Sequence, residues 1–415
     1  MRDARPGASC FGQQGSSGVH AMDTASTAPA MPAAFAGDLQ RVAEPLNLTA
    51  ALPNAAYVDP GFEAAERRAI WQGGWIAVGF EGDVPKRGSV MPVDISDLPL
   101  LMVRGRDDRV RVFHNICRHR GLKLVSHAGR TGSVIRCPYH AWCYRLDGRL
   151  DATPHVGGVG VGRHDAVRAD ELGLAEVRSA VRFGIVFADL SGAAADLDET
   201  LGPLAARWTD FAGQGFHAGA EDSTFELEVG CNWKLAVENY LESYHLPSVH
   251  PGLNSYSRIE DHELITGADG HAGQISLVYA PSLAAMDGGF PRAAGLSDYW
   301  STRAEYVAVY PNLLYALHAD HWYGIVLLPR GREATVERVR IGYFDPEAAT
   351  GVGRAALRQA NTELWRSVFL EDVEPVERMQ AGRHSPAFDG GVLTPVLEAT
   401  TRDFHAWTAR RMLSA

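Results

Sequence analysis

Two short stretches of this chain, CRHRG and CPYHAW, each place a cysteine close to a histidine. They contribute Cys117 and His119 and then, after a gap of seventeen residues, Cys137 and His140. Thiolate sulfur and imidazole nitrogen are metal ligands, and two such pairs can enclose one metal group between them. Turn-forming residues accompany both pairs, so we expect a fold in which two loops meet at one point.

These four residues suit a Rieske [2Fe–2S] cluster, in which two cysteines hold one iron and two histidines hold the other. The alternative is a structural zinc site, since zinc also binds two cysteines and two histidines. Zinc fingers usually place both cysteines in one pair and both histidines in the other, whereas each pair here mixes them. The mixed pairs favour the cluster, which transfers single electrons, so we expect an electron acceptor within reach.

Composition narrows the class of partner and the compartment. The chain has 415 residues and a net charge of −11, which disfavours nucleic acid or an anionic membrane as its partner. No apolar run approaches the roughly 20 residues of a membrane span. Besides the pairs described above, Cys10, Cys143 and Cys231 form an odd set with no paired spacing. We therefore expect free thiols and a reducing, cytoplasmic location.

The chain divides into four segments. Residues 1–38 are rich in Ala, Gly, Ser and Pro and lack the apolar run of a secretory signal, so we expect them to be disordered, with Met22 as a possible true start. Residues 39–74 are expected to form a helical segment that packs on the catalytic domain. Short strand-like pieces over residues 75–165 predict a small antiparallel β domain, which holds the cluster. Residues 166–415 are expected to form the catalytic domain.

The catalytic segment alternates strands with a few helices. Strand patterns occur at 223–229, 272–280, 312–319, 322–329 and 335–344, and helical patterns occur at 189–208, 232–245, 354–380 and 396–412. An antiparallel sheet with helices packed on one face is the simplest architecture, so the fold class is α+β. The sequence has no glycine-rich dinucleotide fingerprint and no second four-cysteine cluster. Electrons from a nicotinamide would therefore have to arrive through another protein.

A second metal site is indicated by Glu242, His245 and His250. Glu242 and His245 are three residues apart and would share a helix face. His245 and His250 are separated by a break at Pro247, which would let the second ring turn toward the first. Two histidines and one carboxylate form the facial triad of non-haem Fe(II) oxygenases, with open positions for O₂ and substrate.

The third ligand must come from elsewhere in the chain, and our candidate is Asp372. Pro375 lies inside the same predicted helix and leaves the carbonyl of Glu371 without its usual donor, so a kink could aim Asp372 inward. Glu371 and Asp389 are the alternatives. A pair of acidic residues is more often a solvated face, and histidines near a helix end are often capping residues. The cluster pattern upstream favours the metal site.

Asn239 and Tyr244 are candidates to orient the ligands or to line the pocket, although Tyr244 could equally be a packed core residue. Aromatic residues gather late in the chain. Their faces would attract a cationic N-methyl group or a flat aromatic substrate, but most of them are expected simply to fill the interior of the sheet. They are Tyr299, Trp300, Tyr306, Tyr310, Tyr315, Trp322 and Tyr323.

Together these motifs resemble the α subunit of Rieske non-haem iron oxygenases, a family of aromatic-ring hydroxylases and related N- and O-demethylases. The resemblance extends over residues 75–385. It is carried by CRHRG, CPYHAWCYRLDG, CNWKLAVENYLESYHLPSVHP, YPNLLYALHADHWYGIVLLPRG and LEDVEPVERMQAG.

The resemblance implies a Rieske domain followed by a helix-grip (START-like) catalytic domain with mononuclear Fe(II) at His245, His250 and Asp372. It also implies a homotrimer in which the cluster of one subunit faces the iron of its neighbour, with Glu242 joining His245 to His140 across that interface. A separate NAD(P)H-dependent reductase with flavin and an iron–sulfur cluster would supply the electrons. Ala141 stands where the family usually has glycine, so this cluster loop is expected to be tighter.

Many family members carry aspartate at the position of Glu242. The longer acid resembles the subgroup that demethylates quaternary ammonium compounds such as betaines, choline-like compounds and carnitine. We therefore expect monooxygenation of an N-methyl group with release of formaldehyde. The alternatives are a dioxygenase that hydroxylates an aromatic acid and a non-catalytic electron carrier or ligand-binding protein. A pure carrier would not need the second metal site.

Overall fold

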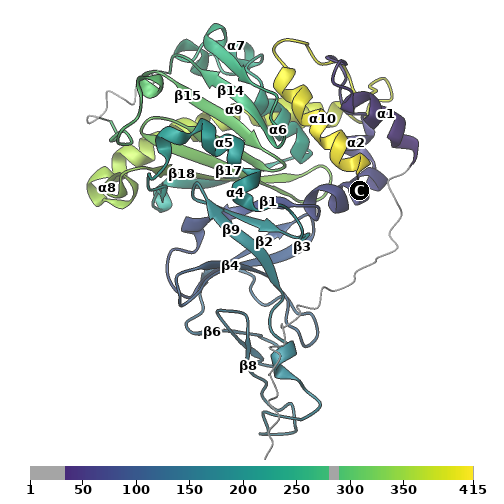
Figure 1. Cartoon of the computed structure of the whole chain (residues 1–415), viewed down its shortest axis with the longest axis vertical. Coiled ribbons are helices and arrows are strands. Elements are labelled where there is room, and N and C mark those ends of the chain that lie inside the picture. The colour runs from purple at the N-terminus through teal and green to yellow at the C-terminus, as the bar shows by residue number, and fades with distance from the viewer. Residues whose placement is uncertain (1–32, 280–288, 415) are drawn as a thin grey trace, which may run out of the picture.

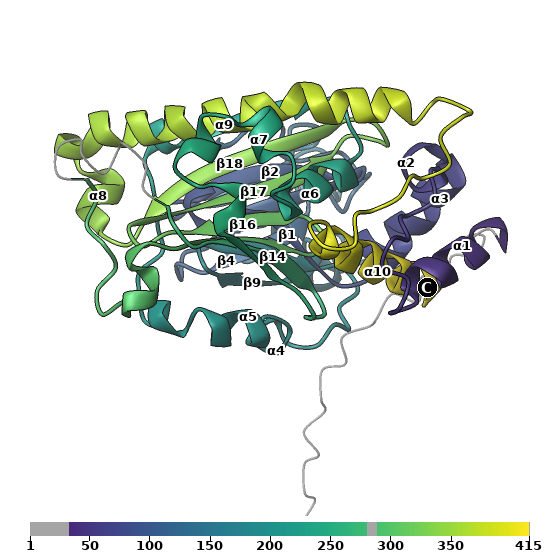
Figure 2. The same ribbon diagram turned by 90° about the horizontal axis from the view of Figure 1, so that it is seen from above.

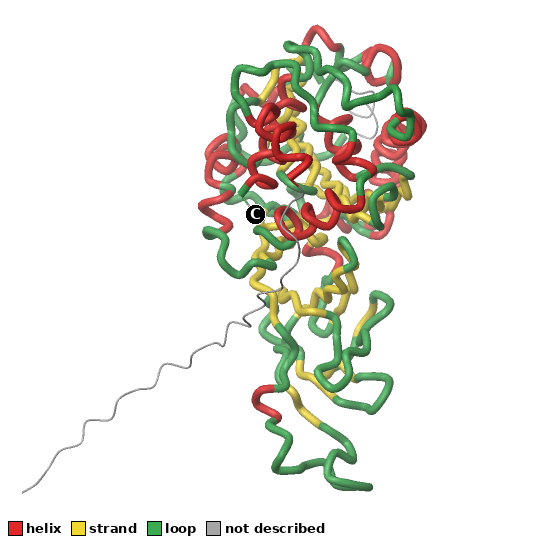
Figure 3. Tube along the Cα trace, turned by 90° about the vertical axis from the view of Figure 1, so that its right-hand side faces the viewer, coloured by secondary structure: helices red, strands yellow, loops and turns green. Residues whose placement is uncertain are grey.

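The computed structural model describes residues 33–279 and 289–414. Figure 1 shows an elongated molecule with a helix-rich body at one end and a tip of strands and loops at the other. Figure 3 shows the same division, since helices gather in the body and the tip consists mainly of strands and loops. Among the helices of the described residues, none is long and apolar enough to cross a membrane.

The sheet next to the tip is antiparallel and has the strand order β1-β10-β9-β4-β3-β2-β5. Its strands are β1 (Trp75–Phe80), β2 (Ser89–Ile95), β3 (Leu98–Arg104), β4 (Val110–His114), β5 (Gly129–Arg130), β9 (Glu176–Arg182) and β10 (Ile185–Asp189). The hairpin of β9 and β10 lies beyond residue 165, yet it pairs with β4 on one side and β1 on the other. This sheet is therefore not confined to residues 75–165.

The tip is a small three-stranded sheet of β6 (Val134–Arg136), β7 (Cys143–Arg145) and β8 (Leu150–Ala152). It has its own core, in which Phe113, Ile135 and Tyr144 pack around the buried Cys117 and Cys137. The two cysteines are therefore anchored by hydrophobic packing.

The body contains an eight-stranded antiparallel sheet with the order β11-β18-β17-β16-β15-β14-β13, and β12 also pairs with β18. The strands are β11 (His217–Ala218), β12 (Thr224–Val229), β13 (His262–Ile265), β14 (His271–Ser276), β15 (Ala304–Val309), β16 (Leu313–Leu317), β17 (His321–Pro329) and β18 (Thr335–Tyr343). The central strands β15, β16 and β17 are buried along their whole length, so both faces of this sheet are covered.

The seven-stranded sheet is the first sheet, and the eight-stranded sheet is the catalytic sheet. Three helices cover the face of the catalytic sheet that points away from the first sheet: α6 (Trp233–Leu241), α9 (Ala355–Gly382) and α10 (Ala399–Leu413). Figure 2 shows α9 running along one edge of the body, and α10 lying beside α1 (Ala33–Ala43). The shorter helices are α2 (Ala55–Val58), α3 (Pro60–Glu66), α4 (Leu197–Thr200), α5 (Gly202–Arg207), α7 (Leu246–Val249) and α8 (Pro346–Thr350). An antiparallel sheet with helices over one face confirms the α+β expectation.

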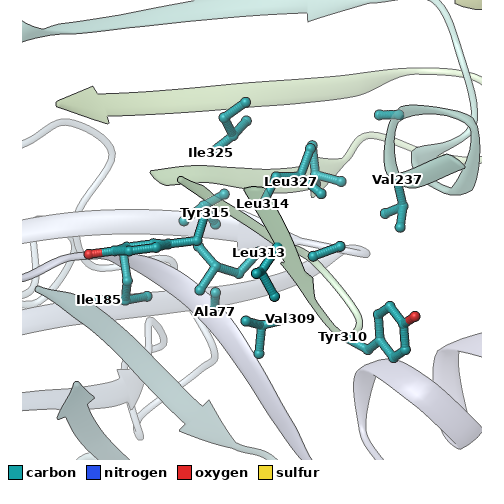
Figure 4. Packing of buried hydrophobic residues seen from close by; sticks show 14 of the residues in the cluster. Ala77, Ile185, Val237, Val309, Tyr310, Leu313, Leu314, Tyr315, Ile325 and Leu327 are labelled. Atoms are coloured by element: carbon teal, nitrogen blue, oxygen red, sulfur yellow. The ribbon is translucent and has the colours of Figure 1, made fainter. Parts of the chain in front are cut away.

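The two large sheets are joined through a buried core (Figure 4). The Tyr315 hydroxyl donates to the carbonyl of Phe183 at 3.1 Å. The fully buried Asn312 side chain accepts from the N–H of Ala77 at 2.9 Å and donates to its carbonyl at 2.8 Å. A Cβ at Gly324 would lie 2.9 Å from the Phe80 ring, so glycine permits the close approach of the sheets. These contacts fix the first sheet on the catalytic sheet.

The structure corrects the sequence prediction at two helices. Residues 33–38 begin α1 and are not disordered, whereas residues 1–32 of that predicted segment lie outside the described residues. The helix predicted over 232–245 ends at Leu241, and Glu242 is extended. Pro247 does not end a helix but lies in the first turn of α7, where a missing N–H costs nothing.

The segment 189–208 is also less helical than its pattern predicts. Its first residue ends β10, and helix is confined to α4 and α5. Strand β15 was not among the predicted strands, although it lies between β14 and β16 in the sheet.

Candidate metal centres and substrate cavity

The two cluster loops close in the same way. In the first, the N–H of Gly121 donates to the carbonyl of Cys117 at 2.9 Å; in the second, the N–H of Ala141 donates to the carbonyl of Cys137 at 3.1 Å. Gly121 and Ala141 are each the fifth residue of their loop, counted from the cysteine, and both have positive φ, +74° for Gly121 and +59° for Ala141. The left-handed conformation favours glycine, so Ala141 holds its loop with some backbone strain.

The four predicted cluster residues come together where the loops after β4 and β6 meet. Cys117 and Cys137 are each 2% exposed, whereas His119 is exposed and His140 is half-buried. The two imidazole rings lie 4.7 Å apart, and the ring of Trp142 stacks on His119 at 4.8 Å. Buried thiols and outward imidazoles suit a group whose histidine-bound iron faces a partner. The donor set therefore fits a Rieske cluster.

Tyr144 contacts the cluster site, and its sequence position alone does not predict this role. Its hydroxyl lies 3.2 Å from the Cys117 Sγ and accepts from the N–H of Arg118 at 2.9 Å. Burial raises the pKa of this phenol, and the neighbouring thiol raises it further. The hydroxyl therefore keeps its proton and can donate it to a thiolate sulfur.

The three predicted iron ligands also come together. One ligand atom from each of His245, His250 and Asp372 lies within 4.8 Å of the others. The Nε2 of His250 is 2.9 Å and the Nε2 of His245 is 3.7 Å from the same Oδ1 of Asp372. Two neutral imidazoles and one carboxylate on one side of a cavity fit a mononuclear Fe(II) with open positions. Asp389, the weaker alternative, is not part of this group.

Each of these histidines also contacts a carboxylate other than that of Asp372, through its Nδ1 atom. The Oε1 of Glu242 lies 2.7 Å from the Nδ1 of His245, and the Oε2 of Glu371 lies 2.7 Å from the Nδ1 of His250. Each carboxylate accepts from Nδ1–H and thereby leaves Nε2 free to bind a metal. Glu371 therefore contacts the ring nitrogen of His250 that faces away from Asp372, where it is placed to orient this imidazole.

The carboxylates also set the charge of the site. Burial lowers the pKa of His250, but the hydrogen bonds and charges of Asp372 and Glu371 outweigh burial and raise it overall. Asn239 donates from Nδ2 to the Oδ1 of Asp372 at 2.9 Å, so it contacts one of the three candidate ligands. This surplus of acceptors would hold a cation.

The metal ligands form one end of a cavity of about 790 Å³ of empty space, including its mouth. Its walls come mainly from α6, α9 and the helix-covered face of the catalytic sheet. Aromatic side chains share these walls with aliphatic ones; the aromatic residues are Tyr240, Tyr306, Tyr323, Trp365 and Phe369. Of the late aromatic residues in the sequence, only Tyr306 and Tyr323 line the cavity. Tyr315 and Trp322 are buried elsewhere, as expected for the interior of a sheet.

Glu337 of β18 also lines the cavity. Burial raises the pKa of its carboxyl to about 8, and the charge of Asp372 contributes to the rise. The sequence analysis missed this residue because a single glutamate in a strand carries no spacing signal. Only the register of β18, which pairs Glu337 with Leu227 and Leu327, places it here.

Two residues that are close to the metal ligands in the sequence do not enter the cavity. Tyr244 is not among the lining residues, and its side chain is 52% exposed. Because the chain leaves the helix at Glu242, Tyr244 points outward and neither lines the pocket nor packs in the core. Glu238 faces the other side of α6, where Tyr57 and His405 contact its carboxylate.

The two metal centres of one chain are far apart. Figure 1 shows α7, which separates His245 from His250, at one end of the long axis, and β6, which leads to Cys137, in the tip at the other end. The cluster of a single chain therefore does not face its own iron site.

Comparison with known proteins agrees with both sites. The model "Rieske [2Fe-2S] domain" matches residues 74–163, and the model "Ring hydroxylating alpha subunit (catalytic domain)" matches residues 216–414. The chain belongs to the Rieske non-haem iron oxygenases, as an α subunit. It is an oxidoreductase with a [2Fe–2S] domain and a non-haem iron catalytic domain.

Among its relatives are three oxygenases that act on amines. The chain is 27% identical to the glycine betaine monooxygenase oxygenase subunit of Chromohalobacter salexigens, over 88% of this chain and 86% of the relative. It is 27% identical to the chloroplastic choline monooxygenase of Arabidopsis thaliana, over 87% and 82%. It is 30% identical to the carnitine monooxygenase oxygenase subunit of Escherichia coli K12, over 50% and 54%.

Solved structures share the fold. A quaternary ammonium Rieske monooxygenase in complex with L-carnitine matches with a TM-score of 0.72 and 22% identity, over 92% of this chain and 99% of that one. Naphthalene 1,2-dioxygenase from Rhodococcus sp. matches with a TM-score of 0.71 and 20% identity, over the same shares. The fold is thus common to amine and arene oxygenases, and the substrate must be argued from the cavity.

Proposed function

We propose that this protein is the terminal oxygenase component that hydroxylates an N-methyl group of a quaternary or tertiary amine. The observation that supports it is the cavity, which five aromatic side chains and Glu337 line together with His245, His250 and Asp372. Aromatic faces attract a methylated ammonium through cation–π contacts. The amine oxygenases among the relatives support the same substrate class.

The reaction consumes O₂, two electrons and two protons for each methyl group. One oxygen atom enters the C–H bond to give a hydroxymethyl group, and the other leaves as water. The C–N bond of the hydroxymethyl amine then breaks and releases formaldehyde and the demethylated amine. The mononuclear iron, when bound, supplies the activation of O₂, and the cluster supplies electrons.

The chain's own residues position this chemistry. His245, His250 and Asp372 would hold the metal, while Glu242 and Glu371 fix the two imidazoles through Nδ1. In this proposal Glu242 would also pass a proton or an electron between His245 and a cluster histidine of another subunit.

A homotrimer would bring the tip of one subunit to the iron site of the next, with His140 facing Glu242. The separation of the two centres within one chain supports this arrangement (Figure 1). Electrons would come from a separate NAD(P)H-dependent reductase with flavin and an iron–sulfur cluster. Outside the cluster site, Cys143 and Cys231 form no disulfide within the described residues, which supports a reducing, cytoplasmic location.

Formaldehyde release in a single turnover tests the proposal. The protein is reduced without oxygen, mixed with a panel of methylated amines and aromatic acids, and then exposed to O₂. We expect formaldehyde with at least one amine and none with the His245→Ala variant, whose cluster spectrum should be intact. A hydroxylated ring product without formaldehyde would instead place the chain among the arene hydroxylases, the second candidate, which the aromatic cavity also accommodates.

A further inference from the structure

Most polar groups of the cavity wall already have protein partners. Ser257 contacts His262 at 3.0 Å, and His262 contacts the Oε1 of Gln274 at 2.8 Å. Gln274 donates in turn to the carbonyl of Tyr240 at 3.3 Å. Burial lowers the pKa of His262, so its ring stays neutral near pH 7. These groups form a closed network and are not positioned to pair with a substrate charge.

Three polar groups of the wall differ from this network. Within the described residues, the carboxylate of Glu337 makes no hydrogen bond or ion pair. The buried Oδ1 of Asn239 and the buried hydroxyl of Tyr306 also lack hydrogen-bond partners. The Oδ1 of Asn239 can only accept, and a buried acceptor without a partner is costly. The cavity therefore suits a ligand that is positively charged or that donates hydrogen bonds.

The charge of the lining points the same way. Its carboxylates are Glu242, Glu337 and Asp372, and no lysine or arginine is among the described residues that line the cavity. Glu242 and Asp372 are engaged by the histidines of the metal site, whereas Glu337 is not. Burial in the cavity raises the pKa of Glu337 to about 8, and a cation beside it would favour its ionised form. A substrate carboxylate would instead meet acidic side chains and no lysine or arginine among these lining residues to offset its loss of water.

We propose that Glu337 is the counter-ion of the substrate ammonium and that the site selects an N-methylated amine whose only charge is that ammonium, in preference to a zwitterionic betaine that also carries a carboxylate. The inference rests on the proposed function and names the substrate class of the same site. The aromatic walls enclose the methyl groups, Glu337 balances the positive charge, and the hydroxyl of Tyr306 remains for a neutral polar group of the substrate.

Binding of matched ligands to the anaerobic, reduced holoenzyme tests this selection by calorimetry. Choline, glycine betaine and 3,3-dimethylbutan-1-ol share a head of three methyl groups and differ in charge. Pentyltrimethylammonium and 4-trimethylammoniobutanoate repeat the comparison with a longer tail. We expect each monocation to bind roughly tenfold or more tightly than its zwitterionic counterpart, and choline to exceed the neutral alcohol by a similar factor.

Variants at Glu337 assign the preference to this carboxylate. Glu337→Gln should remove most of the difference between choline and the neutral alcohol while affinity for the alcohol stays within about twofold. Glu337→Asp, which keeps the charge, should retain part of the preference. The matched control is Glu228→Gln on the neighbouring β12, whose side chain is exposed, and it should change nothing. The cluster spectrum and Tm of each variant verify its fold.

The results of these experiments distinguish a failure of this inference from a failure of the proposed function. Demethylation with betaines bound as tightly as monocations would overturn the inference and leave the proposed function standing. A choline preference that survives in Glu337→Gln, or failure of every amine to bind, would also overturn it. Ring hydroxylation of an aromatic acid without formaldehyde from any amine would overturn the proposed function itself.

Discussion

At the residue scale, Glu371 shows how a side chain that touches no metal can control one. Its Oε2 lies 2.7 Å from the Nδ1 of His250 and sets which ring nitrogen carries the proton. Replacing such a partner typically weakens metal binding about 10–100-fold. We expect Glu371→Gln to lose mononuclear iron to a competing chelator at correspondingly lower chelator concentration, with the cluster spectrum unchanged.

The control for this variant lies one turn further along the same helix. Glu374 is 79% exposed and pairs only with Arg378 among the described residues. Glu374→Gln should therefore retain iron as the unmodified protein does. Equal iron retention in the two variants would show that Glu371 does not support His250.

Tyr144 allows a similar test at the cluster. Its hydroxyl, 3.2 Å from the Cys117 Sγ, is placed to donate to a sulfur that becomes more negative on reduction. Hydrogen bonds to cluster sulfur favour the reduced state and raise the reduction potential. Tyr144→Phe should therefore assemble the cluster but lower its potential, measured by redox titration.

Tyr139→Phe is the matched control for that variant. Tyr139 is 59% exposed and its ring lies 3.7 Å from His140, so the substitution removes a phenol close to the cluster but keeps the ring contact. We expect no change in potential. A fall of equal size in both variants would contradict a specific role for the Tyr144 hydroxyl.

The sequence was sufficient for residues whose chemistry depends on local spacing. The cluster residues lie in two short stretches, and His245 and His250 lie five residues apart, so their pattern survives without the fold. Asp372 was predicted with less support, and its neighbour Glu371 was considered only as a rival ligand. Glu337 and Tyr144 could not be predicted, because their roles depend on sheet register and on packing between loops.

At the scale of elements, the helix that precedes the iron ligands is held by a buried ion pair. Lys234 in the first turn of α6 donates to the Oε1 of Glu66 in α3 at 2.5 Å, and the Trp233 indole donates to the same carboxylate. The two charged side chains are 0% and 5% exposed. This pair ties the N-terminal helices to the element that carries Asn239.

Breaking that pair should destabilise the whole chain. We expect Lys234→Met to lower the free energy of unfolding by about 3–5 kcal/mol, since it leaves a buried carboxylate unpaired. The double variant with Glu66→Leu should recover much of the loss. Urea unfolding measures both effects, and the control Arg41→Met, from an exposed pair with Asp38, should cost no more than about 1 kcal/mol. A double variant as unstable as the single one would contradict this account.

Element boundaries were the part of the fold that the sequence predicted least well. Strands β12, β17 and β18 were predicted closely because alternation and bounding turns are local signals. The helix break at Glu242 was not predicted, because the apolar spacing of α6 continues past Leu241 and gives no local stop. That break nevertheless matters for function, since it turns Tyr244 outward and the His245 ring toward His250.

At the scale of the whole molecule, the distance between the two metal centres decides how electrons must travel. The cluster loops and the iron ligands lie at opposite ends of the long axis (Figure 1). Electrons that passed from the cluster to the iron site within one chain would have to cross the first sheet and the catalytic sheet. A ring of three chains with head-to-tail contacts would place the two centres side by side, and this can be tested without knowing the substrate's affinity.

Mixed trimers provide the test. His119→Ala removes a cluster ligand, and His245→Ala removes an iron ligand, so a trimer of either variant alone should be inactive. If the two variants are co-expressed with different tags, every mixed ring contains one junction at which an intact cluster faces an intact iron site. Because an unmodified ring has three such junctions, mixed trimers should show about one third of its formaldehyde production per trimer.

The activity of the mixed trimers depends on the route of electron transfer and not on the stability of either variant. If electrons passed within a chain, no subunit of a mixed trimer would carry both intact centres, and activity would be absent. Iron content of the His119→Ala protein and the cluster spectrum of the His245→Ala protein verify that each retains its other centre. Inactive mixed trimers with both centres verified would refute transfer between subunits and remove the bridging role proposed for Glu242.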